Sequence, residues 1–549
     1  MTRSRPDPRD RLPDGRLATL AALAAGAEPD GETADSTDGD DTDDGRLLAE
    51  PSPFTGEPLR PVSAATEGDV AHAVERARAA QPEWADRPLS DRTAVLDRVA
   101  TLVLDRRRAL CDLVQAETGK EREGADTEVW DAAANANYYA TKAPELLAST
   151  RRAGAIPGVT RATEHRHPVG VVGLVTPWNY PLTLVVSDAL PALVAGNAVV
   201  IKPAEATPYT ALAARELLLD AGVPRDCVQV VPGRGETAGE TLVERADFVG
   251  FTGSTEVGRK VAATAGRRLV DASLELGGKN PMVVLDDADV DAAVRGAVAG
   301  CFANAGQLCV SIERVYVDEA VYEEFRDAFV AATRAQTLGV DFSYDHDVGS
   351  LVGPEQLDRV RSAVDDAVDD GATVLTGGRH RPDVGPYVYE PTLLEGVDDD
   401  AAIVQTETFG PVVTLHPVAG DEEAVERAND TPYGLHASVW TGDATRGERV
   451  ARRIDAGTVS VNDAYVSAYG AVDAPMGGRG DSGLGRRHGR DGIRKYTEAQ
   501  TVAVSRAGSL SLPSPPLRGV AARLSSAALR ANIALSRLAR RLPFGGGRR

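Results

Sequence analysis

A repeated alternation of short apolar runs and helical stretches constrains the fold of this 549-residue chain more than any other feature. Strands that alternate with helices in this way predict a parallel sheet covered by helices. The first set of apolar runs, β-branched in part, lies at residues 169–175, 198–201, 228–231 and 248–251. The second set follows residue 309, at residues 314–317, 372–376 and 412–418, with a helix expected over 319–332. The sequence therefore predicts an α/β fold with two α/β domains.

The segments outside this alternation differ in composition. Residues 25–44 are mostly Asp, Gly, Thr and Glu, which predicts that residues 1–45 form an acidic disordered segment, with an acidic interaction arm as the alternative. Helical spacing of apolar residues follows at 70–80 and 90–116. Between residues 138 and 168 the pattern is interrupted.

The charge balance excludes nucleic acid as a partner of the main body. The chain has 60 Lys and Arg against 82 Asp and Glu, a formal net charge of −22 that repels nucleic acid. Such a surface, with only six lysines, suits a halophilic protein in a cytosol of high salt. A GC-rich genome would explain the shortage of lysine but not the excess of acid.

The cysteines and the apolar content indicate a cytoplasmic, reduced protein. Four cysteines without zinc-like spacing predict neither a metal site nor a disulfide scaffold. The N-terminus has no apolar signal core, and no run approaches the roughly 18 apolar residues of a spanning helix.

Two motifs carry the chemistry, LELGGK at residues 274–279 and CFANAGQLCVSIER at 301–314. Cys309 is the candidate nucleophile, because a thiolate attacks carbonyl carbon readily and its thioester product is easily hydrolysed. Cys301 is expected to pack in the core. Glu275, between apolar residues and glycines, is expected to be partly desolvated, which raises the pKa of a carboxyl group toward the range of a general base.

These motifs, in this order, resemble the two signature motifs of the aldehyde dehydrogenase superfamily, and the resemblance covers residues 47–505. It implies an aldehyde dehydrogenase-like fold: an atypical Rossmann NAD-binding domain, an α/β catalytic domain and a β oligomerisation arm. The implied boundaries are 46–147 and 166–276 for the NAD-binding domain, 277–485 for the catalytic domain, 148–165 and 486–506 for the arm, and 507–549 for a C-terminal tail. The arm implies a homodimer or homotetramer.

The resemblance also implies the reaction, the oxidation of a small-molecule aldehyde to a carboxylic acid through a thiohemiacetal and a thioester. It makes Cys309 the nucleophile and Glu275 the base that activates water. Asn179, in the motif TPWNYP at 176–181, would stabilise the oxyanion together with the Cys309 N–H. The presence of Glu275 argues against the branch of the superfamily that releases acyl-CoA.

The cofactor site is read from several further motifs. The motif FTGSTEVG at 251–258 follows an apolar strand and begins a helix, whose N-terminal N–H groups and dipole suit a pyrophosphate. The GxGxxxG motif at 233–239 departs from the ordinary Rossmann fingerprint, GxGxxG. Glu205, in the motif KPAE, can accept from ribose hydroxyls but would repel a 2′-phosphate, so NAD is expected in preference to NADP. The residues expected to bind the cofactor are Trp178, Lys202, Glu205, Gly235, Thr252, Gly253, Ser254, Gly277, Glu407 and Phe409.

The substrate remains open between two kinds of aldehyde. The stretch 474–489 with KYTE at 495–498 looks most like the succinate-semialdehyde dehydrogenase group. A substrate that carries a carboxylate favours an arginine as its partner. At the positions where succinate-semialdehyde dehydrogenases place arginines, this chain has Ser187, Asp188 and Ala303. Unless Arg314, Arg479 or another cation replaces them, a neutral or hydrophobic aldehyde is the alternative.

The tail beyond residue 507 is basic. A helical projection of residues 517–542 gathers leucines on one face and arginines beside it, without any acidic residue. This amphipathic tail suits either an anionic membrane surface or the acidic body of its own oligomer, and both alternatives stay open. A catalytically idle, membrane-recruited scaffold is the rival class, and the presence of Cys309, Glu275 and Asn179 speaks against it.

Overall fold

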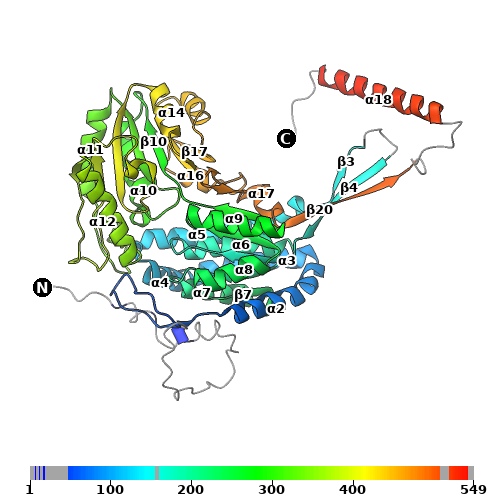
Figure 1. The fold of residues 1–549 in the computed structure, drawn as a ribbon, viewed down its shortest axis with the longest axis horizontal. Coiled ribbons are helices and arrows are strands. Elements are labelled where there is room, and N and C mark those ends of the chain that lie inside the picture. The colour runs from blue at the N-terminus through cyan, green and yellow to red at the C-terminus, as the bar shows by residue number, and fades with distance from the viewer. Residues whose placement is uncertain are drawn as a thin grey trace, which may run out of the picture. The chain divides into compact units, whose positions relative to one another are not determined.

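The structure, a computed structural model, describes residues 7, 12, 16–18, 47–154, 160–506 and 518–541. It divides into two units (Figure 1), of which the first comprises Met1–Ala143 and Val169–Tyr496 and the second Pro144–Pro168 and Thr497–Arg549. The acidic segment expected over 25–44 lies outside the described residues. No helix within the described ranges is long and apolar enough to cross a membrane.

The first unit holds a six-stranded sheet in the order β19-β9-β8-β5-β6-β7, in which β19 alone is antiparallel to its neighbour. Four of the parallel strands, β5 to β8, fall on the four apolar runs of the first set, and this part of the α/β prediction is confirmed, whereas β9 was not predicted. The strands are β5 (Val171–Val175), β6 (Ala198–Lys202), β7 (Val228–Val230), β8 (Phe248–Thr252), β9 (Asp271–Glu275) and β19 (Gly483–Leu484). The helices that connect them are α6 (Pro181–Val194), α7 (Pro208–Asp220), α8 (Glu240–Arg245) and α9 (Thr255–Arg268).

The same unit holds a seven-stranded sheet in the order β12-β13-β14-β11-β10-β16-β17, with only β12 antiparallel to its neighbour. Its strands are β10 (Asn280–Val284), β11 (Ile312–Asp318), β12 (Thr373–Thr376), β13 (Thr392–Glu395), β14 (Val412–Val418), β16 (His436–Trp440) and β17 (Thr458–Val461). Helices pack on both faces: α10 (Val290–Phe302), α11 (Tyr322–Arg334) and α12 (Pro354–Asp369) on one, α14 (Asp421–Asn429) and α15 (Ala444–Ala451) on the other.

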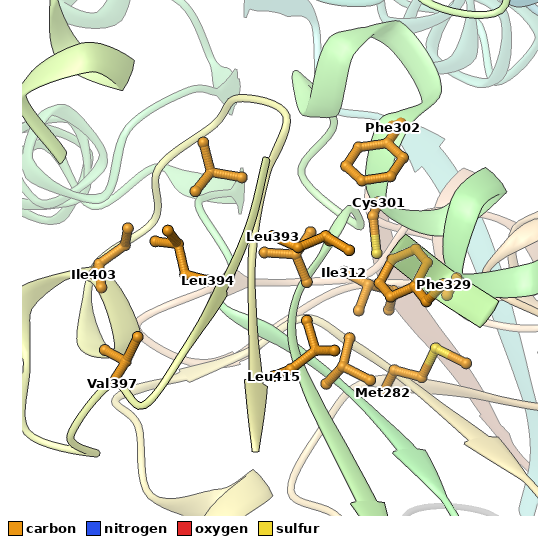
Figure 2. Close-up of a cluster of buried hydrophobic side chains, with 14 of the residues drawn as sticks. Met282, Cys301, Phe302, Ile312, Phe329, Leu393, Leu394, Val397, Ile403 and Leu415 are labelled. Carbon is orange, nitrogen blue, oxygen red and sulfur yellow. The ribbon is translucent and has the colours of Figure 1, made fainter. Parts of the chain in front are cut away.

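The largest apolar cluster of this sheet explains the role of Cys301. Figure 2 shows Cys301 among Met282, Phe302, Ile312 and Phe329, all of them buried. The thiol therefore fills core volume between α10, α11 and the sheet, and the prediction that Cys301 packs in the core is confirmed.

The N-terminal helices differ from the expectation at one point. The helical spacing over 90–116 belongs to two helices, because the chain leaves helical geometry at Arg106 (φ −98°, ψ 12°). Apolar residues keep helical spacing on both sides of the bend, so periodicity alone did not reveal it. The helices are α2 (Glu67–Asp86), α3 (Leu89–Asp105), α4 (Arg107–Thr118) and α5 (Arg122–Leu146).

The second unit contains a three-stranded antiparallel sheet in the order β20-β4-β3 and the helix α18 (Arg518–Arg541). The strands are β3 (Thr150–Arg152), β4 (Thr160–Pro168) and β20 (Thr497–Ser505). Its place in the chain is that of the expected arm, although the domain boundaries stay predictions. The remaining short elements are β1 (Leu47–Leu48), β2 (Val62–Ser63), β15 (Tyr433–Gly434), β18 (Arg479–Gly480), α13 (Ala402–Gln405), α16 (Val466–Tyr469) and α17 (Gly489–Arg494).

Candidate active site

The sequence motifs meet where the two sheets of the first unit adjoin. Asn179, Thr252 and Glu275 lie at or just beyond the carboxyl ends of β5, β8 and β9, the edge at which open α/β sheets bind ligands. Residues 276–279 then lead from β9 into β10, and Cys309 precedes β11 at the amino edge of the neighbouring sheet. The connection between the sheets therefore brings the base and the nucleophile together.

A cavity of about 160 Å³ lies at this junction. Ten of the thirteen predicted site residues line it: Cys309, Glu275, Asn179, Trp178, Thr252, Gly253, Ser254, Gly277, Glu407 and Phe409. Lys202, Glu205 and Gly235 do not. Gln356 and Arg359 line it as well and were not predicted, because α12 carries no motif that marks them.

A strained turn holds Cys309 in place. Asn304 and Ala305 have positive φ angles (52° and 54°), and Gly306 follows at 72°, where an added Cβ would come within 2.1 Å of the Gly410 carbonyl oxygen. The Gln307 side chain ties the turn to its surroundings by donating to the Asn304 and Ser350 carbonyls at 2.9 and 3.2 Å. The glycine and the amide of this motif are therefore required by backbone geometry.

The Cys309 thiol is partly buried, and its charge state depends on its neighbours. Burial, with the nearby carboxylates Glu407 and Glu275, raises the pKa of Cys309 to about 12, and Arg487 opposes the shift. The thiol therefore requires a base, or added positive charge, to become a thiolate at neutral pH.

Asn179 is held by a network of buried polar groups. Its Nδ2 donates to the Gln307 carbonyl at 3.0 Å, and its own carbonyl accepts from the Lys120 ammonium at 2.7 Å. Lys120 is fully buried and forms an ion pair with Glu128, whose other oxygen accepts the Leu182 N–H at 2.9 Å at the start of α6. A single buried ion pair thus fixes both the loop that carries Asn179 and the helix that follows it.

Replacing Lys120 by Met is expected to lower the free energy of unfolding by about 3–5 kcal/mol, because it leaves the Glu128 carboxylate buried without its partner. Thermal unfolding measures the effect. Lys260→Met removes the same side chain from an exposed pair with Glu256, and is expected to change the melting temperature little. Equal melting temperatures for the two variants would contradict the role of the buried pair.

Glu275 has the environment expected of a general base. It is buried, and its Oε1 has no hydrogen-bond partner in the described structure. Burial raises the pKa of Glu275 to about 7, while the charges of Arg487 and Lys495 act in the opposite direction. Arg487 donates to Asp188 and to the Thr252 hydroxyl, each at 2.5 Å. This cluster could not be predicted from local motifs, since more than 200 residues separate Arg487 from Glu275 along the chain.

On the other wall of the cavity, Glu407 and Phe409 are positioned by a second buried pair. Glu407 accepts the Gly278 N–H at 2.9 Å, and burial raises its pKa to about 7. Glu313, paired with Lys279, accepts the N–H of Phe409 at 2.9 Å. The ring of Phe409 meets that of Trp178 edge-on, with centroids 5.4 Å apart.

The arginines considered for a carboxylate substrate do not reach the cavity. The guanidinium of Arg314 is fully buried and donates to the backbone carbonyls of Lys279 and Ala428 at 2.9 Å. Arg479 forms an exposed pair with Asp455 at 2.9 Å. Neither of these two arginines therefore takes the place of the missing ones in this cavity, and a neutral or hydrophobic aldehyde stays the alternative.

Comparison with known proteins identifies the class. Residues 41–502 match the aldehyde dehydrogenase family. A protein of Mycolicibacterium smegmatis named "Putative succinate-semialdehyde dehydrogenase", with NADP(+) in its name, is 51% identical over 460 residues, 84% of this chain and 89% of the relative. The mitochondrial succinate-semialdehyde dehydrogenase of Oryza sativa is 35% identical over 469 residues, 84% of this chain and 87% of the relative.

Solved structures agree with this match. Betaine aldehyde dehydrogenase of Staphylococcus aureus in complex with NAD⁺ superimposes with a TM-score of 0.81 at 32% identity, covering 85% of this chain and 93% of that one. An E. coli NADP dependent enzyme gives a TM-score of 0.81 at 32% identity, covering 84% and 95%. The fold and the matches define an oxidoreductase that uses a nicotinamide dinucleotide. The chain belongs to the aldehyde dehydrogenase family.

Proposed function

We propose that this protein oxidises an aldehyde to a carboxylic acid by covalent catalysis at Cys309, with NAD as the electron acceptor. The observation that carries the proposal is the shared cavity, in which a thiol and a carboxyl group with a pKa of about 7 stand beside an amide donor. A thiol alone is common in protein cores, but this combination is what acyl transfer through a thioester requires.

The residues present fit a nicotinamide dinucleotide. The amino end of α9 favours a pyrophosphate through its helix dipole, with the Val257 N–H donating to the Ser254 hydroxyl at 3.4 Å. An added Cβ at Gly235 or Gly239 would meet no atom within 4 Å, which leaves open space beside these glycines. Trp178, Phe409 and Glu407 would hold the nicotinamide end, and Lys202 and Glu205 the adenine ribose. When bound, this cofactor supplies the acceptor for the hydride that leaves the aldehyde carbon.

The protein's own groups perform the remaining steps. The Cys309 thiol gives up its proton to water, and the thiolate attacks the aldehyde carbon to form the anion of a thiohemiacetal. The Asn179 amide has two N–H groups and donates one to Gln307, so the other can meet the developing oxyanion together with the Cys309 N–H. Loss of hydride leaves a thioester. Glu275 then accepts a proton from water, whose oxygen attacks the thioester carbon. The Cys309 sulfur leaves as a thiolate and takes this proton from Glu275, so that the acid and the thiol are released.

The preference for NAD rests on Glu205. Its carboxylate pairs with Lys202 at 2.8 Å and lies close enough to Glu50 to raise the pKa of that residue, after burial. Two carboxylates disfavour a 2′-phosphate at this end of the site. NADP is the alternative, and the names of the curated relatives favour it.

Glu205→Gln is therefore expected to raise kcat/KM for NADP relative to that for NAD by about tenfold, because it removes one repulsive charge. Steady-state rates with each cofactor measure the ratio, and Glu244→Gln, an exposed change on α8, is the matched control. A wild-type enzyme that already prefers NADP tenfold, or a ratio unchanged in Glu205→Gln, would contradict the assignment.

Succinate semialdehyde is the candidate substrate that the names of the relatives favour, and a neutral or hydrophobic aldehyde is the alternative, because neither Arg314 nor Arg479 lines the cavity. We further propose that the antiparallel sheet of β3, β4 and β20 joins the chains of a cytoplasmic homodimer or homotetramer.

The helix α18 has two proposed binding surfaces, an anionic membrane and the acidic body of the oligomer. Its Leu524 and Leu535 are 66% and 64% exposed, as an amphipathic helix that binds either surface requires.

A further inference from the structure

Two cations flank Glu275, the proposed base. Arg487 and Lys495 lie just before and just after α17, and their side chains are 8% and 11% exposed. The Arg487 guanidinium donates to the hydroxyl of Thr252, the residue on β8 that is paired with Glu275 on β9. The Lys495 ammonium donates at 3.1 Å to the hydroxyl of Ser273, two positions before Glu275 on β9. Paired residues, and residues two apart on a strand, point to the same face of a sheet, so both cations lie on the face of Glu275.

A single carboxylate holds both cations. Asp188, on α6, accepts from Arg487 at 2.5 Å and from Lys495 at 2.9 Å, and the Tyr496 hydroxyl donates to it at 2.6 Å. The Asp188 side chain is buried, so water screens these charges little. The two cations and the carboxyl groups of Asp188 and Glu275 therefore form one enclosed cluster, whose charges balance when Glu275 is ionised.

Glu275 itself is not fixed by contact with the cations. It forms no ion pair within the described ranges, and its Oε1 and the Arg487 Nε are both buried without a hydrogen-bond partner there. An added Cβ at Gly477 would come within 3.0 Å of the same Glu275 oxygen, so the glycine keeps the space beside it open. The charges of the cluster therefore act on Glu275 through space, and the carboxyl group stays available to water.

The cations and Asp188 act on Glu275 in opposite directions. Burial raises the pKa of Glu275, the charges of Arg487 and Lys495 lower it, and the charge of Asp188 raises it. A general base is most effective when its pKa lies near the working pH. Two unopposed cations would keep Glu275 ionised but weakly basic, whereas loss of Arg487 would keep it protonated at neutral pH.

Most other titratable groups around the cluster carry no charge at neutral pH. They are Arg486, Cys309, Glu407, His488, Tyr139 and Tyr469. Burial raises the pKa values of the two tyrosines and of Cys309, and it lowers the pKa of His488 to about 4. Arg486 donates to the Gly478 carbonyl at 3.0 Å, and its charge acts on Glu275 less than that of Arg487 does.

We propose that Arg487 and Asp188 are opposed positioning residues for thioester hydrolysis, in which Arg487 favours the ionised form of Glu275 and Asp188 limits that effect so that Glu275 remains an effective base. The inference rests on the function proposed for Glu275. It extends that function to two residues that touch neither the substrate nor the Cys309 sulfur.

Hydrolysis of the acyl group can be followed without hydride transfer. 4-Nitrophenyl acetate acylates a reactive thiol, and loss of the acetyl group from Cys309 is then followed by mass spectrometry, with the rate in Glu275→Gln subtracted as background. In the wild type the rate is expected to rise with a midpoint at a pH of about 7. The midpoint is expected to fall by about 1 pH unit in Asp188→Asn and to rise by about 1 pH unit in Arg487→Met.

Opposite shifts separate a charge effect from damage to the fold, which would lower the rate in both variants without moving the midpoints apart. Arg487→Lys keeps the charge and is expected to keep the midpoint of the wild type. Arg490→Met, which removes an exposed arginine from α17, is the matched control. An unmoved midpoint in Asp188→Asn, or shifts of both variants in the same direction, would overturn the inference. The first of these outcomes suffices if Arg487→Met does not fold.

Thermal unfolding detects the same coupling without any reaction. At pH 8, the gain in melting temperature that Glu275→Gln produces measures the cost of burying the ionised carboxyl group. This gain is expected to be smaller in the Asp188→Asn background, and larger in the Arg487→Met background, than in the wild type. Equal gains in all three backgrounds would overturn the inference even if Cys309 took up no acetyl group. Unequal gains of the expected order, with no aldehyde oxidised, would instead contradict the proposed reaction alone.

Discussion

Replacement of Cys309 by Ala is expected to abolish aldehyde oxidation, with a fall in kcat of at least about four orders of magnitude. The loss is this large because no thiohemiacetal or thioester can form, and binding alone leaves only a small residual rate. NADH formation, followed by absorbance at saturating aldehyde, measures the effect. Since Cys309 is only partly buried and lines the cavity, the protein is expected to fold and to retain cofactor binding.

Cys301→Ala is the matched control, because the two thiols lie in one motif but in different surroundings. Cys301 lies in the core among Phe302 and Phe329, so its replacement removes packing and is expected to lower the melting temperature while leaving kcat close to that of the wild type (Figure 2). Loss of activity in Cys301→Ala with activity retained in Cys309→Ala would contradict the assignment of the nucleophile.

Glu275→Gln is expected to slow steady-state turnover by about a thousandfold while leaving the first hydride transfer nearly intact. The amide cannot accept a proton from water, so the thioester accumulates. Rapid mixing is expected to show a burst of one NADH per active site followed by very slow release. A variant without a burst, or with wild-type turnover, would show that Glu275 does not act on the thioester.

The pH dependence follows from the same carboxyl group. Its pKa is about 7 in the folded protein against a usual 4.5, so the wild-type rate is expected to rise as the pH increases through about 7 and the carboxylate forms. The raised pKa also lowers stability: the folded state loses free energy as the pH rises from about 4.5 to 7, by up to about 3 kcal/mol. Glu275→Gln should therefore melt at a higher temperature than the wild type at pH 8, and at a similar one at pH 4.5.

The site residues that could be predicted from the sequence are those that belong to short sequence motifs. Cys309 and Asn179 lie in loop segments and Glu275 ends β9, and each has glycines or prolines close to it in sequence, so the motif and the geometry coincide. The roles of Lys120 and Arg487 could not be predicted, because they depend on how the helices pack. Lys120 pairs with Glu128 on α5, and Arg487 pairs with Asp188 on α6.

In the fold, too, the local features could be predicted from the sequence and the long-range ones could not. The alternation of apolar runs with helices indicated parallel sheets, because strands such as β5 and β6 are buried on both faces and are therefore mostly apolar. The order of the strands depends on crossovers that leave no local trace, as with β16 entering beside β10. The same holds for the cofactor residues. Lys202 and Glu205 lie three positions apart in one motif and could be predicted, whereas Gln356 and Arg359 line the cavity only through the position of α12.

The covalent thioester at Cys309 is the central claim, and mass spectrometry of Glu275→Gln tests it most directly. After mixing with aldehyde and NAD, the variant is expected to gain the mass of one acyl group, located on the peptide that carries Cys309 and absent when Cys309 is also replaced by Ala. An unmodified protein that nevertheless forms NADH, or an acyl group on any other residue, would contradict the account.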